Sequence, residues 1–179
     1  MKHHQAAAVI AFAALLAGVA AAQKNHENKM PSADGTFMTK AAQGGLAEVE
    51  LGNLAVQHAS DQKVKDFGQR MIDDHTKAND ELKSIASQKG VTLPASVDSQ
   101  SEAVKNRLSG LRGAAFDRAY MRDMVNDHRK DVAEFQKEAD HGSDADVKAF
   151  AGKTLPTLQQ HLKMAQETLS EVERHSASR

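Results

Sequence analysis

Four polar side chains that can bind a metal ion fall among apolar residues, each in a different predicted helix. At about 100° per residue, His75, His128 and His161 each share a face with Leu, Val, Met and Phe side chains, and Glu48 does so in the first helix. An unpaired buried imidazole or carboxylate is costly in an apolar interior. Three imidazoles and one carboxylate suit Zn, Fe, Cu or Ni. One hypothesis is therefore that these four residues form a site for a divalent transition metal ion.

The alternative is that each histidine is an ordinary core residue that is hydrogen-bonded by a neighbour such as Asp74 or Asp127. The metal hypothesis requires all four side chains to lie at one level of the bundle. Counted along the chain from the predicted turns at Ser60 and Ser143, and at about 1.5 Å per residue, their levels nearly agree. It also requires the three imidazoles to lie within about 8 Å of one another, given a Zn–N bond of about 2.1 Å.

A di-iron centre is not favoured. The bundle-core di-iron pattern uses Glu-x-x-His on two helices and a single Glu on each of the other two. Three residues before the histidines stand apolar side chains instead, Ile72, Val125 and Leu158. The sequence contains no Cys, so a thiolate site and a thiol nucleophile are excluded as well. No catalytic residue is predicted, and a redox enzyme is the least favoured function.

The elements that must position these residues are helices. Only three Pro, 4% aromatic residues and many Ala, Lys, Glu and Gln favour helix over strand. We predict four helical tracts over 34–59, 61–89, 113–141 and 144–174, with a short helix within 99–108. Gly44, Gly45 and Gly52 lie inside the first tract, where we expect them to permit close helix packing.

An internal repeat relates the two halves of the chain. Residues 60–67 (SDQKVKDF) match residues 143–150 (SDADVKAF) at Ser, Asp, Val, Lys and Phe. The repeat predicts two helical hairpins in tandem, joined by a long link over 90–112. The predicted fold is therefore all-α, a ferritin-like four-helix bundle with a long crossover between helices 2 and 3. An up-down-up-down bundle with a long loop is the alternative.

The first residues read as a targeting segment. A short basic start, an uncharged apolar run over 6–19 and three alanines at 20–22 form the pattern of a signal peptide cleaved after Ala22. We predict a signal peptide over 1–22, a disordered linker over 23–33, the bundle over 34–174 and a disordered tail over 175–179. The protein is then expected to be exported, most simply to the periplasm, without a membrane span after cleavage. A formal charge of −1 argues against a nucleic-acid partner.

Several segments in order resemble one bacterial family of exported ferritin-like proteins, classed as a domain of unknown function and often labelled outer-membrane or periplasmic. The segments are AAQGGLAEVELG (41–52), MIDDHTKAN (71–79), AFDRAYM (115–121) with Asp127 and His128, and LPTLQQHLKMA (155–165). The resemblance covers about residues 34–173. It implies a ferritin-like bundle in the bacterial envelope and no established activity, substrate or metal.

Two functions are therefore compared. The first is a non-catalytic envelope protein that is stress-related, binds a protein partner or self-associates, as the smooth apolar pattern of the core suggests. The second is a metal-binding bundle that uses Glu48, His75, His128 and His161.

Overall fold

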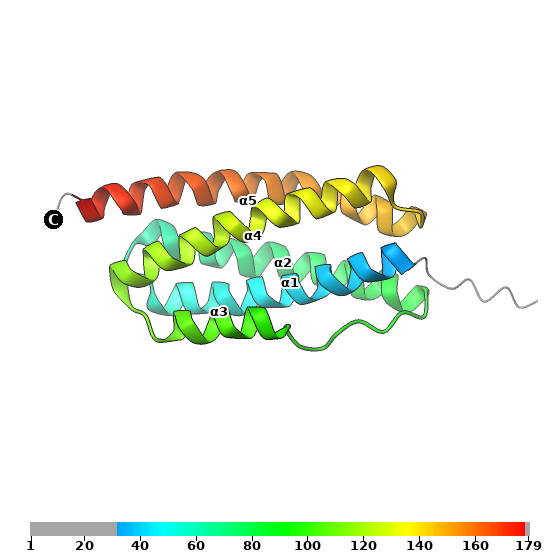
Figure 1. Ribbon diagram of the computed structural model, residues 1–179, viewed down its shortest axis with the longest axis horizontal. Coiled ribbons are helices and arrows are strands. Elements are labelled where there is room, and N and C mark those ends of the chain that lie inside the picture. Colours follow the sequence, from blue (N-terminus) through cyan, green and yellow to red (C-terminus); the bar gives the residue numbers. More distant parts are fainter. Residues whose placement is uncertain (1–31, 178–179) are drawn as a thin grey trace, which may run out of the picture.

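The computed structural model describes residues 32–177, and within them every regular element is a helix (Figure 1). The all-α prediction is therefore confirmed. The predicted signal peptide, residues 23–31 of the predicted linker and residues 178–179 lie outside the described part of the chain. The helices are α1 (Ser32–His58), α2 (Gln62–Gln88), α3 (Ser99–Ser109), α4 (Gly113–His141) and α5 (Ala145–Ala177).

The helix bounds differ from the predicted ones by at most three residues. The helix α1 starts two residues earlier than predicted, and α5 continues through Pro156 to Ala177, so helix replaces the end of the predicted linker and the start of the predicted tail. The short helix predicted in the connection is α3.

The long helices form two antiparallel pairs, α1 with α2 and α4 with α5 (Figure 1). The segment after α2 runs back along the bundle, and α3 lies on the outside against α1 and α4. As a result α2 and α4 run in the same direction, and so do α1 and α5.

Two aspartates close the two hairpin turns of the internal repeat. Asp117 on α4 accepts hydrogen bonds from the backbone N–H groups of Ser60 (3.0 Å) and Asp61 (3.1 Å). Asp34 on α1 accepts from the N–H groups of Ser143 (3.3 Å) and Asp144 (2.7 Å). Each turn is thus held by a carboxylate from the other hairpin, which satisfies amides that a helix start leaves without partners.

Close backbone approach joins α1 to α2. A Cβ atom added to Gly52 would lie 2.7 Å from the carbonyl oxygen of Gly68, and one added to Gly68 would lie 2.7 Å from the Cβ of Ala55. The expected role of Gly52 in close packing is therefore seen, while Gly45 faces the side chain of Asn79 on α2 rather than its backbone. Gly44 differs, because a Cβ there would meet no atom within 4 Å.

The apolar core has two parts with a polar layer between them. One part includes Phe67, Met71 and Met124, and the other includes Leu82, Phe135 and Leu158. Each of the three inward histidines lies in sequence between a residue of one part and a residue of the other. The histidine layer therefore separates two apolar clusters of the core.

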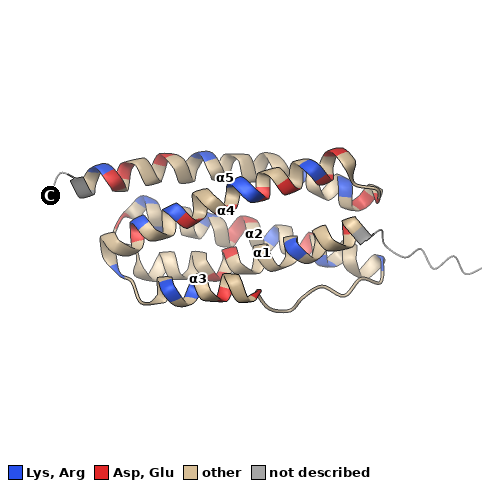
Figure 2. Ribbon diagram, viewed as in Figure 1, with Lys and Arg blue, Asp and Glu red and all other residues tan. Residues whose placement is uncertain are grey.

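Acidic and basic segments alternate along the helices in Figure 2, and no helix visible there carries a face of a single charge. Among the described helices, none has a stretch long and apolar enough to span a bilayer.

Candidate metal centre

Three helices each bring one imidazole into the polar layer. His75 comes from α2, His128 from α4 and His161 from α5, with exposed fractions of 7%, 0% and 1%. The ring centroids are 5.8 Å apart for His75 and His128, 5.5 Å for His75 and His161, and 5.4 Å for His128 and His161. One nitrogen from each ring lies within 4.8 Å of the other two. The imidazoles predicted to share a level thus meet in one cluster, within the 8 Å limit that a metal site requires.

The orientation of His128 is fixed by its own helix. Its Nδ1 lies 3.0 Å from the carbonyl oxygen of Met124, one turn earlier on α4. A carbonyl oxygen only accepts, so Nδ1 carries the hydrogen and Nε2 carries the lone pair. That Nε2 is buried and has no hydrogen-bond partner among the described residues.

The orientation of His161 is fixed by a carboxylate on α2. Its Nε2 lies 3.0 Å from Oδ2 of Asp74, which also accepts a hydrogen bond from Nε of Arg70. Burial raises the pKa of Asp74, but the hydrogen bonds from Arg70 and His161 outweigh it and lower that pKa overall. Asp74 is therefore an anion at neutral pH, Nε2 of His161 donates to it, and the buried Nδ1 of His161 keeps its lone pair without a partner within the described structure.

The third imidazole, that of His75, is the one least fixed by neighbouring groups. Nε2 of His75 is buried and makes no hydrogen bond to any described residue. Burial, followed by the neighbouring His128 and His161, lowers the pKa of His75 well below its usual value, and Asp74 opposes this only in part. Burial also lowers the pKa of His161, and burial with the nearby His161 lowers the pKa of His128 to about 4. All three rings are therefore neutral at pH 7, the state in which imidazole binds a metal ion.

Glu48 lies beside the cluster, on the far side of one ring. Its Oε1 is 3.8 Å from Nδ1 of His128, the nitrogen that faces Met124, and its Oε2 is buried without a hydrogen-bond partner in the described residues. Burial raises the pKa of Glu48, and the charges of Asp131, Asp127 and Asp123 raise it further. Within residues 32–177 the three histidines form the metal-competent group, and Glu48 stands next to it.

The sequence suggests Asp74 and Asp127 as hydrogen-bond partners for the histidines, without indicating which histidine each would contact. Asp74 does hold His161, whereas Asp127 pairs with Lys130 at 3.1 Å. Tyr120 is a further buried polar residue, which was not predicted from the sequence. Its ring packs on Phe67 at 6.1 Å, and its buried hydroxyl has no partner among the described residues. The available signal was the spacing, because Tyr120 precedes His128 by two helical turns on one face of α4.

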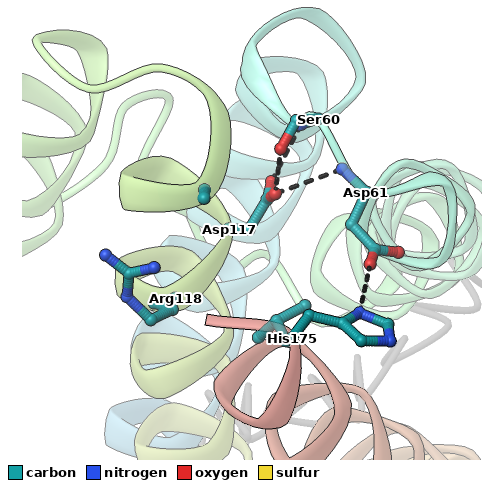
Figure 3. Close-up of a pocket in the computed structure, with 7 residues that line it drawn as sticks. Ser60, Asp61, Asp117, Arg118 and His175 are labelled. Carbon is teal, nitrogen blue, oxygen red and sulfur yellow. Dashed lines mark hydrogen bonds and ion pairs between the residues drawn. The ribbon is translucent and has the colours of Figure 1, made fainter. Parts of the chain in front are cut away.

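A second group of Ser, Asp and His side chains lines a cavity of about 300 Å³ at the end of the bundle (Figure 3). The group resembles a hydrolytic site only in composition. The hydroxyl of Ser60 donates to Asp117, and His175 approaches Asp61 at 3.7 Å, while Asp61 caps α2 through the N–H of Lys63. These contacts hold the turn between α1 and α2, so the group has a structural role.

Comparisons with known proteins bear on the fold and the family. Residues 19–168 match the model of a family described as "Domain of unknown function (DUF4142)". Among solved structures, a DUF305 fragment from Deinococcus radiodurans is similar, with a TM-score of 0.71 and 15% sequence identity, over 79% of this chain and 98% of that one. At this identity the likeness concerns the fold alone. No curated protein matches the sequence.

Proposed function

We propose that this chain, which belongs to the DUF4142 family of unknown function, is a metal-binding helical bundle whose site is formed by His75, His128 and His161. A single observation carries the proposal. Three imidazole nitrogens, each buried and without a hydrogen-bond partner among the described residues, belong to rings that lie side by side in an apolar interior. Leaving three buried ring nitrogens without partners is costly, and a cation bound by one neutral nitrogen of each ring offsets that cost.

The surroundings of the rings also support metal binding. Ligating histidines typically donate their second N–H to a carboxylate or a backbone carbonyl, which fixes the ring and the tautomer. His161 donates in this way to Asp74 and His128 to the carbonyl of Met124. A hydrogen-bonded core histidine has no comparable reason to direct its second nitrogen toward two other imidazoles.

The spacing of the nitrogens suits a small ion. In a tetrahedral site with bonds of about 2.1 Å, ligand nitrogens lie about 3.4 Å apart. The three nitrogens here lie within 4.8 Å of one another. Shifts of about 1 Å or less at each ring, within the reach of small side-chain rotations, bring them to bonding distance.

The type of ligand limits which metal ions fit the site. Three neutral imidazoles suit Zn, Cu, Fe or Ni, and the apolar residues Ile72, Val125 and Leu158 leave no Glu-x-x-His pair for a di-iron centre. We assign Glu48 a supporting role, because its nearest approach is to the nitrogen of His128 that faces Met124. A cation in the site would favour the ionised form of Glu48 and so balance part of its own charge.

We also propose that the protein is exported and that its helices have a ferritin-like arrangement. The run over 1–22 supports export through a signal peptide, and parallel pairs α1/α5 and α2/α4 with a long crossover support a ferritin-like arrangement. Amino-terminal sequencing of the protein from a periplasmic fraction would find Gln23 first if the signal is cleaved. Intact protein that begins at Met1 in the cytoplasm would contradict export.

Elemental analysis of the untagged protein after dialysis against Zn²⁺ tests the site. We expect about one ion per chain in the parent and in His141→Leu, an exposed histidine outside the cluster, and none in His75→Phe or His128→Leu. Circular dichroism establishes that each variant is folded. Equal zinc content in all four folded proteins would refute the proposed site.

A further inference from the structure

The histidine cluster lies beside a hollow on the side of the bundle formed by α1, α3 and α4. This hollow, called the acidic groove below, has a volume of about 230 Å³ and is lined by five acidic residues, Glu48, Asp98, Asp127, Asp131 and Glu134. It is the place where the buried Glu48 faces a solvent-connected space. The groove therefore connects the polar layer of the core with the surface.

A second, much smaller cavity shares part of its lining with the groove. It holds about 30 Å³, roughly the share of one water molecule in the liquid, and His75 is part of its lining. Four residues line both the groove and this cavity: Lys40, Gly44, Asp131 and Glu134. These residues therefore stand between the groove and the small cavity that His75 lines, and Lys40 is paired there with Glu134.

The charges of the groove are only partly neutralised by lysines. Glu134 pairs with Lys40 at 2.8 Å, and Asp127 pairs with Lys130 at 3.1 Å. Asp131 is half-buried and has the charges of Asp127, Glu134 and Lys130 around it, while Oε2 of Glu48, a residue only 3% exposed, has no hydrogen-bond partner among the described residues. An unpartnered buried carboxyl oxygen in a groove with four further acidic residues and only two lysines favours a cation in that space.

Gly44 keeps the junction open. A Cβ atom at Gly44 would meet no atom within 4 Å, whereas one at the adjacent Gly45 would lie 2.0 Å from Oδ1 of Asn79. A side chain at Gly45 would thus displace the Asn79 side chain of α2, whereas one at Gly44 would displace nothing. The space in front of Gly44 belongs to the junction between the groove and the cavity.

We propose that the acidic groove is the entry path for the metal ion, a role that rests on the proposed function of the histidine cluster. A hydrated divalent cation is attracted by the groove, exchanges water for carboxyl oxygens of Asp131 and Glu48 as these groups release their protons to solvent, and passes Gly44 to reach His75. The path changes how fast the ion enters and leaves. The final affinity is set by the three imidazoles.

Stopped-flow mixing of the full chain with Zn²⁺, followed by competition with a fluorescent chelator, tests the path. In Gly44→Leu, whose side chain fills the junction, we expect association and dissociation rates both to fall at least tenfold, with the Kd changed less than threefold. In Asp131→Asn we expect a three- to tenfold slower association that depends less on salt. Gly44→Ala, a smaller change at the same position, should slow both rates less than Gly44→Leu does.

Two matched variants control for helix changes and for lost charge. Gly152→Leu changes a glycine of α5 that lines neither cavity, and Asp140→Asn removes an exposed carboxylate of α4 outside the groove. Both should keep the rates of the parent. A parent that binds zinc, with the same rates in Gly44→Leu and Asp131→Asn, would overturn the path and leave the site. A parent that binds no zinc would overturn both.

Discussion

Nε2 of His161 on α5 lies 3.0 Å from Oδ2 of Asp74 on α2, and this hydrogen bond leaves the other, buried nitrogen of the ring with a lone pair and no described partner. Replacing Asp74 by Asn removes the anion that fixes this tautomer. Loss of such a supporting carboxylate typically weakens metal binding about 10- to 100-fold, and we expect a loss of that size here. Competitive zinc titration would measure it.

The neighbouring Asp73 provides the matched control for this prediction. Its carboxylate accepts a hydrogen bond from Gln69 at 3.0 Å on the exposed side of α2, so Asp73→Asn should bind zinc like the parent. If Asp74→Asn binds zinc as tightly as Asp73→Asn, His161 is not held for metal binding.

The metal-free protein should gain stability when His75 becomes Phe. The change removes a buried nitrogen that has no described partner and keeps a flat ring of similar size beside a cavity of about 30 Å³. We expect the free energy of unfolding in urea to rise by about 1–2 kcal/mol, while zinc no longer raises the Tm. A destabilised variant would show instead that His75 makes a favourable contact in the metal-free core.

The neutral state of His128 makes stability depend on pH. Its pKa is about 4 in the fold and about 6.5 in an unfolded chain, so unfolding takes up a proton between those values. The contribution of this group is therefore complete above pH 6.5 and is lost as the pH falls toward 4, at about 1.4 kcal/mol per pH unit at most and about 3 kcal/mol in all. We expect the unfolding free energy of the metal-free parent, measured in urea at several pH values, to fall by about this amount more than that of His128→Leu between pH 6.5 and pH 4. The same pH dependence in both proteins would contradict a buried neutral ring.

Asp131 should act in the opposite direction. Burial and the charges of Asp127 and Glu134 raise its pKa to about 7, so the folded protein binds a proton that the unfolded chain releases near pH 4. Its contribution is present at low pH and is lost as the pH rises through 7. Because Asp131 is only half-buried, we expect a modest effect. The free energy of unfolding of Asp131→Asn should rise by about 1–2 kcal/mol relative to that of the parent as the pH increases from 5 to 8. A difference in unfolding free energy that does not change with pH would show that Asp131 behaves as a solvent-exposed aspartate.

The contact between Gly52 and Gly68 predicts an unusual response to alanine. Alanine normally favours a helix by about 1 kcal/mol over glycine. A Cβ at Gly52 would lie 2.7 Å from the carbonyl oxygen of Gly68, so Gly52→Ala should instead lower the free energy of unfolding by about 1–3 kcal/mol. Gly44→Ala, in open space on the same helix, should be neutral or stabilising, and equal effects at both positions would contradict the close approach of α1 and α2.

Much of the fold could be predicted because it depends on local patterns. Helical periodicity assigned His75, His128 and His161 to inward faces, and the repeated Ser-Asp turns at Ser60 and Ser143 set their levels along the bundle. The carboxylates that close these turns could not be predicted, since Asp34 and Asp117 act across 109 and 57 residues of chain.

The details of the site depend on contacts between helices. Periodicity places Glu48 on the inward face, but only the packing of α1 against α4 determines that its oxygen meets Nδ1 of His128. The tautomers of His161 and His128 likewise follow from hydrogen bonds to Asp74 and to the carbonyl of Met124, which a sequence pattern does not specify.

X-ray absorption at the zinc K edge of the loaded, untagged chain reports the ligands of the bound ion directly. We expect about one zinc per chain with three imidazole nitrogens at about 2.0–2.1 Å, and loss of this signal in His75→Phe. A spectrum with oxygen ligands alone, or one that is the same in folded His75→Phe, would contradict a metal site built by His75, His128 and His161.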